Sequence, residues 1–118
     1  MDIQQKREEL SNIAFHIIAF AGEAKSLGVE AIQAAKESKF DIAEEKLKEA
    51  RKKYGDAAHK HLSLIQKEAK GEQIEFMLIF MHAEDILLTT ESFLLLAKEH
   101  IEIQRKFNDV YKKLHKEN

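Results

Sequence analysis

The chain has 118 residues, which is the length of one ordinary domain, so we expect residues 1–118 to form a single domain. It has no cysteine, which excludes disulfides and thiol chemistry, and its 19 basic and 21 acidic residues give a net charge of −2, which does not favour nucleic-acid binding. The absence of proline and the presence of only four glycines predict long uninterrupted helices and an all-α fold.

The first predicted helix runs from about Ile3 to about Glu37 and is amphipathic. Its inner positions recur at spacings of three and four: Leu10, Ile13, Ile17, Ala21, Ala24, Gly28 and Ala31. The small side chains in this series predict that a neighbouring helix approaches closely. The segment "ESKFD" ends the pattern, and we expect Ser38 to cap the helix that follows.

The second predicted helix runs from about Phe40 to about Ala69. Its inner face is marked by Phe40, Ala43, Leu47, Ala50, Tyr54, Ala57, His61, Leu64 and Ile65. The segment "AKGE" forms a second break, with Gly71 as the predicted cap at the helix C-terminus. Because both breaks are short, we expect consecutive helices to be antiparallel.

The third predicted helix runs from about Ile74 to about Leu114, and its first half is apolar on nearly every side. One stripe consists of Leu78, Met81, Leu88 and Leu95, and another of Phe80, Leu87, Leu94 and Ile101. Two neighbouring helices can cover only one side of such a helix. We therefore predict an antiparallel three-helix, up-down-up bundle whose third helix is covered further by partners, most simply other copies of the chain.

No stretch reaches the roughly 18 uninterrupted apolar residues of a membrane span, and the first ten residues lack the apolar core of a signal peptide. We expect a cytoplasmic protein that does not insert directly into a membrane.

Asp85 lies on the apolar stripe of the third helix, in the segment "MHAEDILLTT". A buried carboxylate is costly unless it is paired, protonated or bound to a metal. One interpretation is that Asp85 pairs with a Lys or Arg of another helix. The other uses symmetry: if the third helix lines an oligomer axis, every subunit brings its Asp85 to that axis, and the carboxylates favour a hard cation such as Mg²⁺ among them.

His82 lies beside that stripe, one step round the helix. It can be a half-buried histidine that makes one hydrogen bond. It can also be a nucleophile, because a neutral imidazole is able to attack a phosphoryl group and hold it as phosphohistidine. His59 and His61 are two positions apart, point to different sides of their helix and form a poor metal pair.

Two segments resemble the lactose/cellobiose-type IIA components of the bacterial phosphoenolpyruvate-dependent sugar phosphotransferase system. "IAFHIIAFAGEAKSLGVEAIQAAKESKFDIAEEKLKEA", residues 13–50, is similar to the opening of that family. "MHAEDILLTT" is similar to its active-site segment, H-[AG]-Q-D-H-L-M-T. The two motifs, their separation and the helix pattern agree over nearly the whole chain.

The resemblance implies a cytoplasmic phosphocarrier built as a homotrimer of three-helix subunits. His82 matches the phosphorylated histidine, and Asp85 matches the axial, metal-binding aspartate. The family takes a phosphoryl group from the phosphohistidine of HPr and passes it to a cysteine of a IIB component. The membrane IIC component couples this transfer to the uptake of a disaccharide of the cellobiose, diacetylchitobiose or lactose type.

The chain departs from the family pattern at three places. Glu84 stands where the family usually has Gln, and its carboxylate would repel a nearby phosphoryl group. Ile86 stands where a second His is usual. In the second helix, "AHKHLSLI" places His61 where the family's A-H-x-x-Q-T-x-L-I pattern has Gln, and His59 has no equivalent without a shift of frame.

Three functional hypotheses follow. The first is a phosphocarrier. The second is a degenerate family member that acts as a helical trimeric scaffold without phosphotransfer, because of Glu84 and Ile86. The third is a metal-dependent enzyme in the bundle core, which needs several converging ligands per subunit, where the sequence offers Asp85 and His82.

Overall fold

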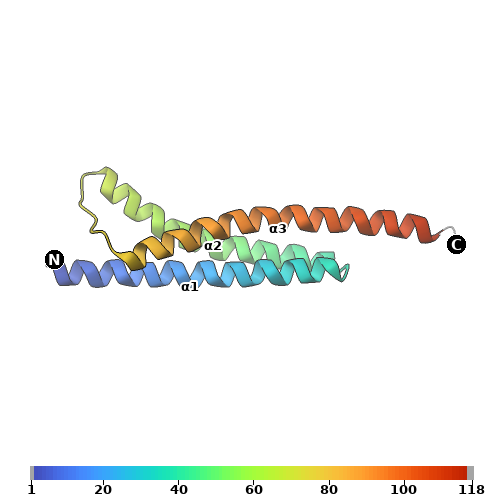
Figure 1. Cartoon of the computed structure of the whole chain (residues 1–118), viewed down its shortest axis with the longest axis horizontal. Coiled ribbons are helices and arrows are strands. Elements are labelled where there is room, and N and C mark those ends of the chain that lie inside the picture. The colour runs from blue at the N-terminus through green and yellow to red at the C-terminus, as the bar shows by residue number, and fades with distance from the viewer. Residues whose placement is uncertain (1, 117–118) are drawn as a thin grey trace.

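The structure is a computed structural model that describes residues 2–116, and every regular element in that range is an α-helix (Figure 1). Helix α1 spans Ile3–Lys36, α2 spans Phe40–Ala69 and α3 spans Leu78–Lys116. The chain runs up, down and up within a rod of 74 × 21 × 19 Å, and both α2 and α3 pack along α1 (Figure 1). The predicted three-helix antiparallel subunit is therefore confirmed, and the homotrimer stays a prediction.

Two backbone hydrogen bonds close the turn between α1 and α2. The amide of Lys39 donates to the carbonyl of Ala34 at 2.9 Å, and the amide of Ser38 donates to that of Ala35 at 3.0 Å. These two bonds close the end of α1 when the residue after the cap is left-handed, and Ser38 has φ 63°. The prediction that Ser38 caps α2 is wrong: its hydroxyl donates instead to Asn108 of α3 at 3.1 Å.

The C-terminal end of α2 has the same pair of backbone hydrogen bonds, and here the left-handed residue is a glycine, Gly71. The amide of Glu72 donates to the carbonyl of Lys67 at 3.1 Å, and that of Gly71 donates to Glu68 at 3.0 Å. Gly71 has φ +100°, a conformation that a residue without Cβ adopts at little cost. The predicted role of Gly71 at this terminus is confirmed.

Helix α3 begins at Leu78, four residues later than the predicted Ile74. The connection before it is held against α1 by a bidentate ion pair, in which the Arg7 guanidinium donates to the Glu75 carboxylate at 2.7 to 3.0 Å. Glu75 lies within residues 72–77, which have no regular secondary structure. The prediction failed because "IEFMLIFM" is apolar in every direction, so its periodicity marks no helix start.

The core is made mostly of alanine. In the described range, eleven of the eighteen buried apolar residues are alanines, and the larger ones are Leu10, Ile17, Leu47, Leu64, Leu87, Leu94 and Ile101. They form one cluster toward the α1–α2 turn and a second toward the start of α3. Side chains this small allow the helix axes to approach closely, as predicted from the alanines and Gly28 of α1.

Candidate functional site

Helix α3 turns one of its two predicted apolar stripes toward α1 and α2 and leaves the other in solvent. The stripe of Phe80, Leu87, Leu94 and Ile101 is the inner one, with Phe80 half-buried and the other three buried. We call the exposed stripe the outer face; it consists of Leu78, Met81, Leu88, Leu95, Leu96 and Ile103. Leu78 is 78% exposed and Leu96 69% exposed, so one subunit leaves in water a row of large apolar side chains of the kind that marks an interaction site.

His82 is exposed and lies at the edge between the two faces of α3. The following residue, Ala83, is fully buried, whereas Asp85 lies roughly 60° further round the helix, on the outer face. Leu78 and Ile86, four positions away on either side, flank the imidazole along the helix. The half-buried histidine of the first interpretation is therefore not observed, and the ring is accessible to a reactant from solvent.

Asp85 is exposed in the single chain, within the outer face. Within residues 2–116, none of the ion pairs between carboxylates and Lys, Arg or His side chains involves Asp85. No group of three or more His, Cys, Asp or Glu side chains that could hold a metal ion occurs in the described part of the chain. A hard cation takes six or more oxygen ligands, so a cation at Asp85 would need carboxylates from other copies or water.

The structure brings together two side chains that the sequence analysis treated separately. His61 of α2 contacts Glu84 of α3, with Nε2 2.8 Å from Oε2. Their side chains are only 16% and 33% exposed, and the His61 ring stacks on Phe80 at a centroid distance of 6.0 Å. An ionised carboxylate only accepts hydrogen bonds, so Nε2 of His61 is the donor. The sequence could not predict this contact, because the register between α2 and α3 depends on the length and shape of their connection.

A second bond between α2 and α3 lies two helical turns further along. The Tyr54 hydroxyl donates to Oε2 of Glu91 at 3.0 Å. Burial, followed by this hydrogen bond, raises the pKa of Tyr54 to about 12. Tyr54 precedes His61 by seven residues, and Glu91 follows Glu84 by seven. The two bonds therefore repeat with the period at which antiparallel helices stay in contact.

The two remaining departures from the family pattern lie away from this pair. Ile86 is half-buried and packs against the core cluster near the start of α3. His59 is exposed and faces a different side of α2 from His61, as its spacing predicts.

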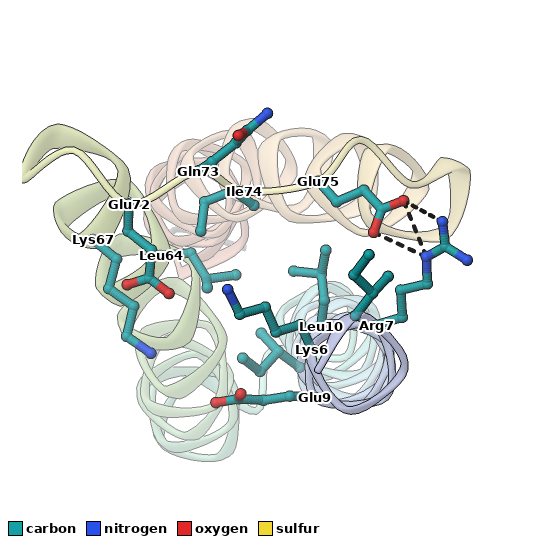
Figure 2. A pocket seen from close by; sticks show the side chains of 12 residues that line it. Lys6, Arg7, Glu9, Leu10, Leu64, Lys67, Glu72, Gln73, Ile74 and Glu75 are labelled. Carbon is teal, nitrogen blue, oxygen red and sulfur yellow. Dashed lines mark hydrogen bonds and ion pairs between the residues drawn. The ribbon is translucent and has the colours of Figure 1, made fainter. Parts of the chain in front are cut away.

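Two hollows surround the connection between α2 and α3. A groove of about 330 Å³ lies between the end of α2, the connection and the start of α3, and its walls include His61, Phe76, Met81 and Glu84. A smaller hollow of about 90 Å³ lies beneath the connection, where Leu10, Leu64 and Ile74 approach one another and the Arg7–Glu75 pair closes one side (Figure 2). The groove reaches residues on either side of His82 in the sequence.

Comparison with known proteins decides the family. Residues 12–105 match the family described as the lactose/cellobiose-specific IIA subunit of the phosphotransferase system. The chain belongs to this IIA family. Its members transfer phosphoryl groups within the phosphotransferase system, in the uptake of sugars.

Individual relatives agree with this assignment along most of their length. The IIA chain is 39% identical over 100 residues to the lactose-specific EIIA component of Staphylococcus epidermidis, covering 85% of this chain and 96% of that one. It is 37% identical to the lichenan-specific IIA component of Bacillus subtilis, covering 86% and 93%. The crystal structure of the cellobiose-specific enzyme IIA from Bacillus anthracis superposes with a TM-score of 0.82 at 32% identity, covering 92% and 94%.

Within residues 2–116, no helix combines the length and the apolar character that crossing a membrane requires.

Proposed function

We propose that this IIA component carries the phosphoryl group on His82, accepting it from the phosphohistidine of HPr and passing it to a cysteine of a IIB component. The observation that carries the proposal is the exposed imidazole of His82 at the edge of the outer face. The chain would act in the cytoplasm as one domain, and a IIC component would couple the transfer to disaccharide uptake. Relatives named for lactose, lichenan and cellobiose leave the sugar open.

The chemistry at His82 is a displacement at phosphorus. The lone pair of one ring nitrogen of the neutral imidazole attacks in line with the donor's P–N bond. The new N–P bond forms as the old one breaks, and that electron pair returns to the imidazole of HPr. The proton on the other nitrogen of His82 passes to solvent while the HPr ring takes one up. In the second transfer, a IIB thiolate attacks phosphorus, the S–P bond forms as the N–P bond breaks, and His82 regains its neutral form as its ring takes up a proton from solvent.

We also propose that three copies of α3 meet about one axis and bury their outer faces. The apolar residues of the outer face support this arrangement, because their burial removes a large hydrophobic area from water. His82 would then lie in a groove between two subunits, where apolar walls exclude water that would hydrolyse the phosphohistidine. A stable monomer at micromolar concentration, measured by light scattering after size exclusion, would contradict the trimer.

Asp85 would come close to the axis in every subunit of that trimer. Three carboxylates near one another repel, and each then favours its protonated form or a cation. One Mg²⁺ per trimer, bound by Asp85 of each chain, would supply the positive charge that holds these carboxylates together. We expect chelation to lower the melting temperature of the wild type, and Asp85→Leu to remove that sensitivity while the trimer persists. Melting of the wild type that is indifferent to chelators would argue against the metal.

Labelling tests the central assignment. Label from phosphoenolpyruvate, passed through enzyme I and HPr, should appear on His82 alone and should be acid-labile and base-stable, as a P–N bond requires. His82→Ala should abolish the label while mass and helicity stay unchanged, and His59→Ala serves as a matched control. Label that persists in His82→Ala would overturn the assignment. A wild type that takes no label would favour the scaffold without phosphotransfer.

A further inference from the structure

We infer that His61 is a positioning residue for phosphoryl transfer: it holds the Glu84 carboxylate against α2 and so keeps its negative charge from opposing a phosphoryl group on His82. The inference rests on the proposed role of His82. The contact between His61 of α2 and Glu84 of α3 does not touch the reacting atoms, so His61 would act on the transfer through Glu84.

The contact is built so that the carboxylate stays in one place. His61 lies between α2 and α3 and is 16% exposed, and the ring of Phe80 stacks beside it. Nε2 donates to Glu84 at 2.8 Å, a charge-assisted bond that is shorter and stronger than one between neutral groups. Glu84 follows His82 by two positions, so the two side chains leave α3 on nearly opposite sides. Without this partner the Glu84 carboxylate would be free to leave α2, and its charge would no longer be confined to the side of α3 that faces away from His82.

The surroundings make His61 hard to replace. The titratable side chains that line the groove are Glu68, Glu75, Glu84 and His61. Glu75 is already bound to Arg7. Within the described residues, His61 is therefore the basic side chain of a groove that otherwise carries carboxylates.

The sequence pattern points the same way. Both His61 and Glu84 occupy places where the family pattern has glutamine. Two amides at these places would carry no charge, whereas a carboxylate introduced alone would face the phosphoryl group without compensation. In this chain, the two residues at these places are a histidine and a glutamate whose side chains touch.

The size of the effect follows from Coulomb's law. A phosphoryl group brings close to two negative charges at neutral pH. At a separation of roughly 10 Å and an effective dielectric constant of about 50 to 80, the full charge of Glu84 would reduce the equilibrium constant for phosphorylation of His82 about fourfold to tenfold relative to an uncharged side chain, which sets the upper limit of the effect.

The test measures the equilibrium constant for exchange of the phosphoryl group between HPr and the IIA chain, with full-length variants of confirmed helicity and mass. We expect His61→Ala to lower this constant, by no more than about fourfold to tenfold. Adding Glu84→Gln to that variant should restore it. Glu84→Gln alone should leave it near the wild-type value, and so should the control His59→Ala. The deficit of His61→Ala relative to wild type should shrink at high salt, which screens exposed charges.

A purely structural role for His61 makes the opposite prediction for the double variant. Failure of Glu84→Gln to rescue His61→Ala, or an unchanged constant in His61→Ala, would overturn the inference while His82 remains the labelled residue. If His61→Ala does not fold, two other variants make the test. His61→Gln keeps an N–H donor of similar reach, and His61→Leu has none. The exchange constant of His61→Gln should lie closer to the wild-type value than that of His61→Leu, and Glu84→Gln should rescue His61→Leu. Absence of label from every variant and from wild type would overturn both this inference and the proposed function.

Discussion

Gly28 is the position at which the close packing of α1 against α3 can be measured most directly. A Cβ added there would lie 2.7 Å from Cε2 of Phe93 and 2.9 Å from Cδ2 of Leu94. Carbon atoms pack best at about 3.5 to 4.0 Å, so both side chains must retreat by close to 1 Å. Leu94 is 4% exposed and has little space into which to move.

Two opposing contributions determine the effect of Gly28→Ala. An alanine in a helix interior is favoured over glycine by about 1 kcal/mol. Forcing an extra methyl group into a packed core costs about 1 to 3 kcal/mol. We therefore expect a net loss of about 1 kcal/mol in the free energy of unfolding. Gly22→Ala is the matched control: it lies in the same helix, and its added Cβ would meet nothing within 4 Å. The control should gain about 0.5 to 1 kcal/mol.

The assay is chemical denaturation followed by circular dichroism, at one chain concentration for all variants. Helix propensity cancels between the two alanine variants, so their difference of about 1 to 3 kcal/mol isolates the steric cost. Phe93→Leu should be less costly in the Gly28→Ala background than in wild type, because it removes the nearer of the two contacts. Equal stabilisation by Gly28→Ala and Gly22→Ala would refute the close approach of α1 and α3.

Three further predictions concern single side chains. Thr90 is 1% exposed and its hydroxyl has no hydrogen-bond partner among the described residues, so Thr90→Val should raise the free energy of unfolding by about 1 kcal/mol; a loss of stability in denaturation would reveal a partner. Ser38→Gly should relieve the left-handed backbone at φ 63° and stabilise by about 0.5 to 1 kcal/mol, and an unchanged midpoint would mean that the lost bond to Asn108 offsets the gain. Because the folded-state pKa of Tyr54 is raised above its ordinary value of 10 to about 12, its contribution to stability is complete below pH 10 and is lost as the pH rises toward 12. Tyr54→Phe should lose less stability than wild type over that range, and identical pH profiles would contradict a folded-state bond to Glu91.

Periodicity alone was enough to predict the three helices and most inner positions of α1 and α2, although Ile65, expected on the inner face of α2, is 48% exposed. For α3 it predicted two apolar stripes without indicating which of them packs within the subunit, and the structure buries Leu87, Leu94 and Ile101. The exposure of the outer face, with Leu95 59% exposed, also agrees with the expectation that two neighbours cover only one side of α3.

The features that the sequence did not predict depend on contacts between distant segments. Helix α3 starts at Leu78 and not at Ile74, and the connection before it contacts α1 through the Arg7–Glu75 pair, whose members are 68 residues apart in the chain. Ser38 lies at the C-terminal end of α1 and does not cap α2, because its backbone is left-handed. Many helices end with a left-handed residue, but that residue is usually glycine, so nothing in the sequence indicated it here. Predicting the contact of His61 with Glu84 requires the register between α2 and α3, which the sequence pattern does not indicate.

The distribution of large apolar side chains also governs how the chain responds to its own concentration. Among the described residues, seven large apolar side chains are buried within the subunit and seventeen are exposed. Burial of an alanine side chain contributes little free energy, so the isolated subunit gains less stability from apolar burial than its helix content suggests. If three copies fold and associate in a single equilibrium, the amount of folded trimer depends on the third power of the concentration of free chain. Dilution would then unfold the protein, and the yield of assembled carrier would rise far more steeply than the amount of chain synthesised.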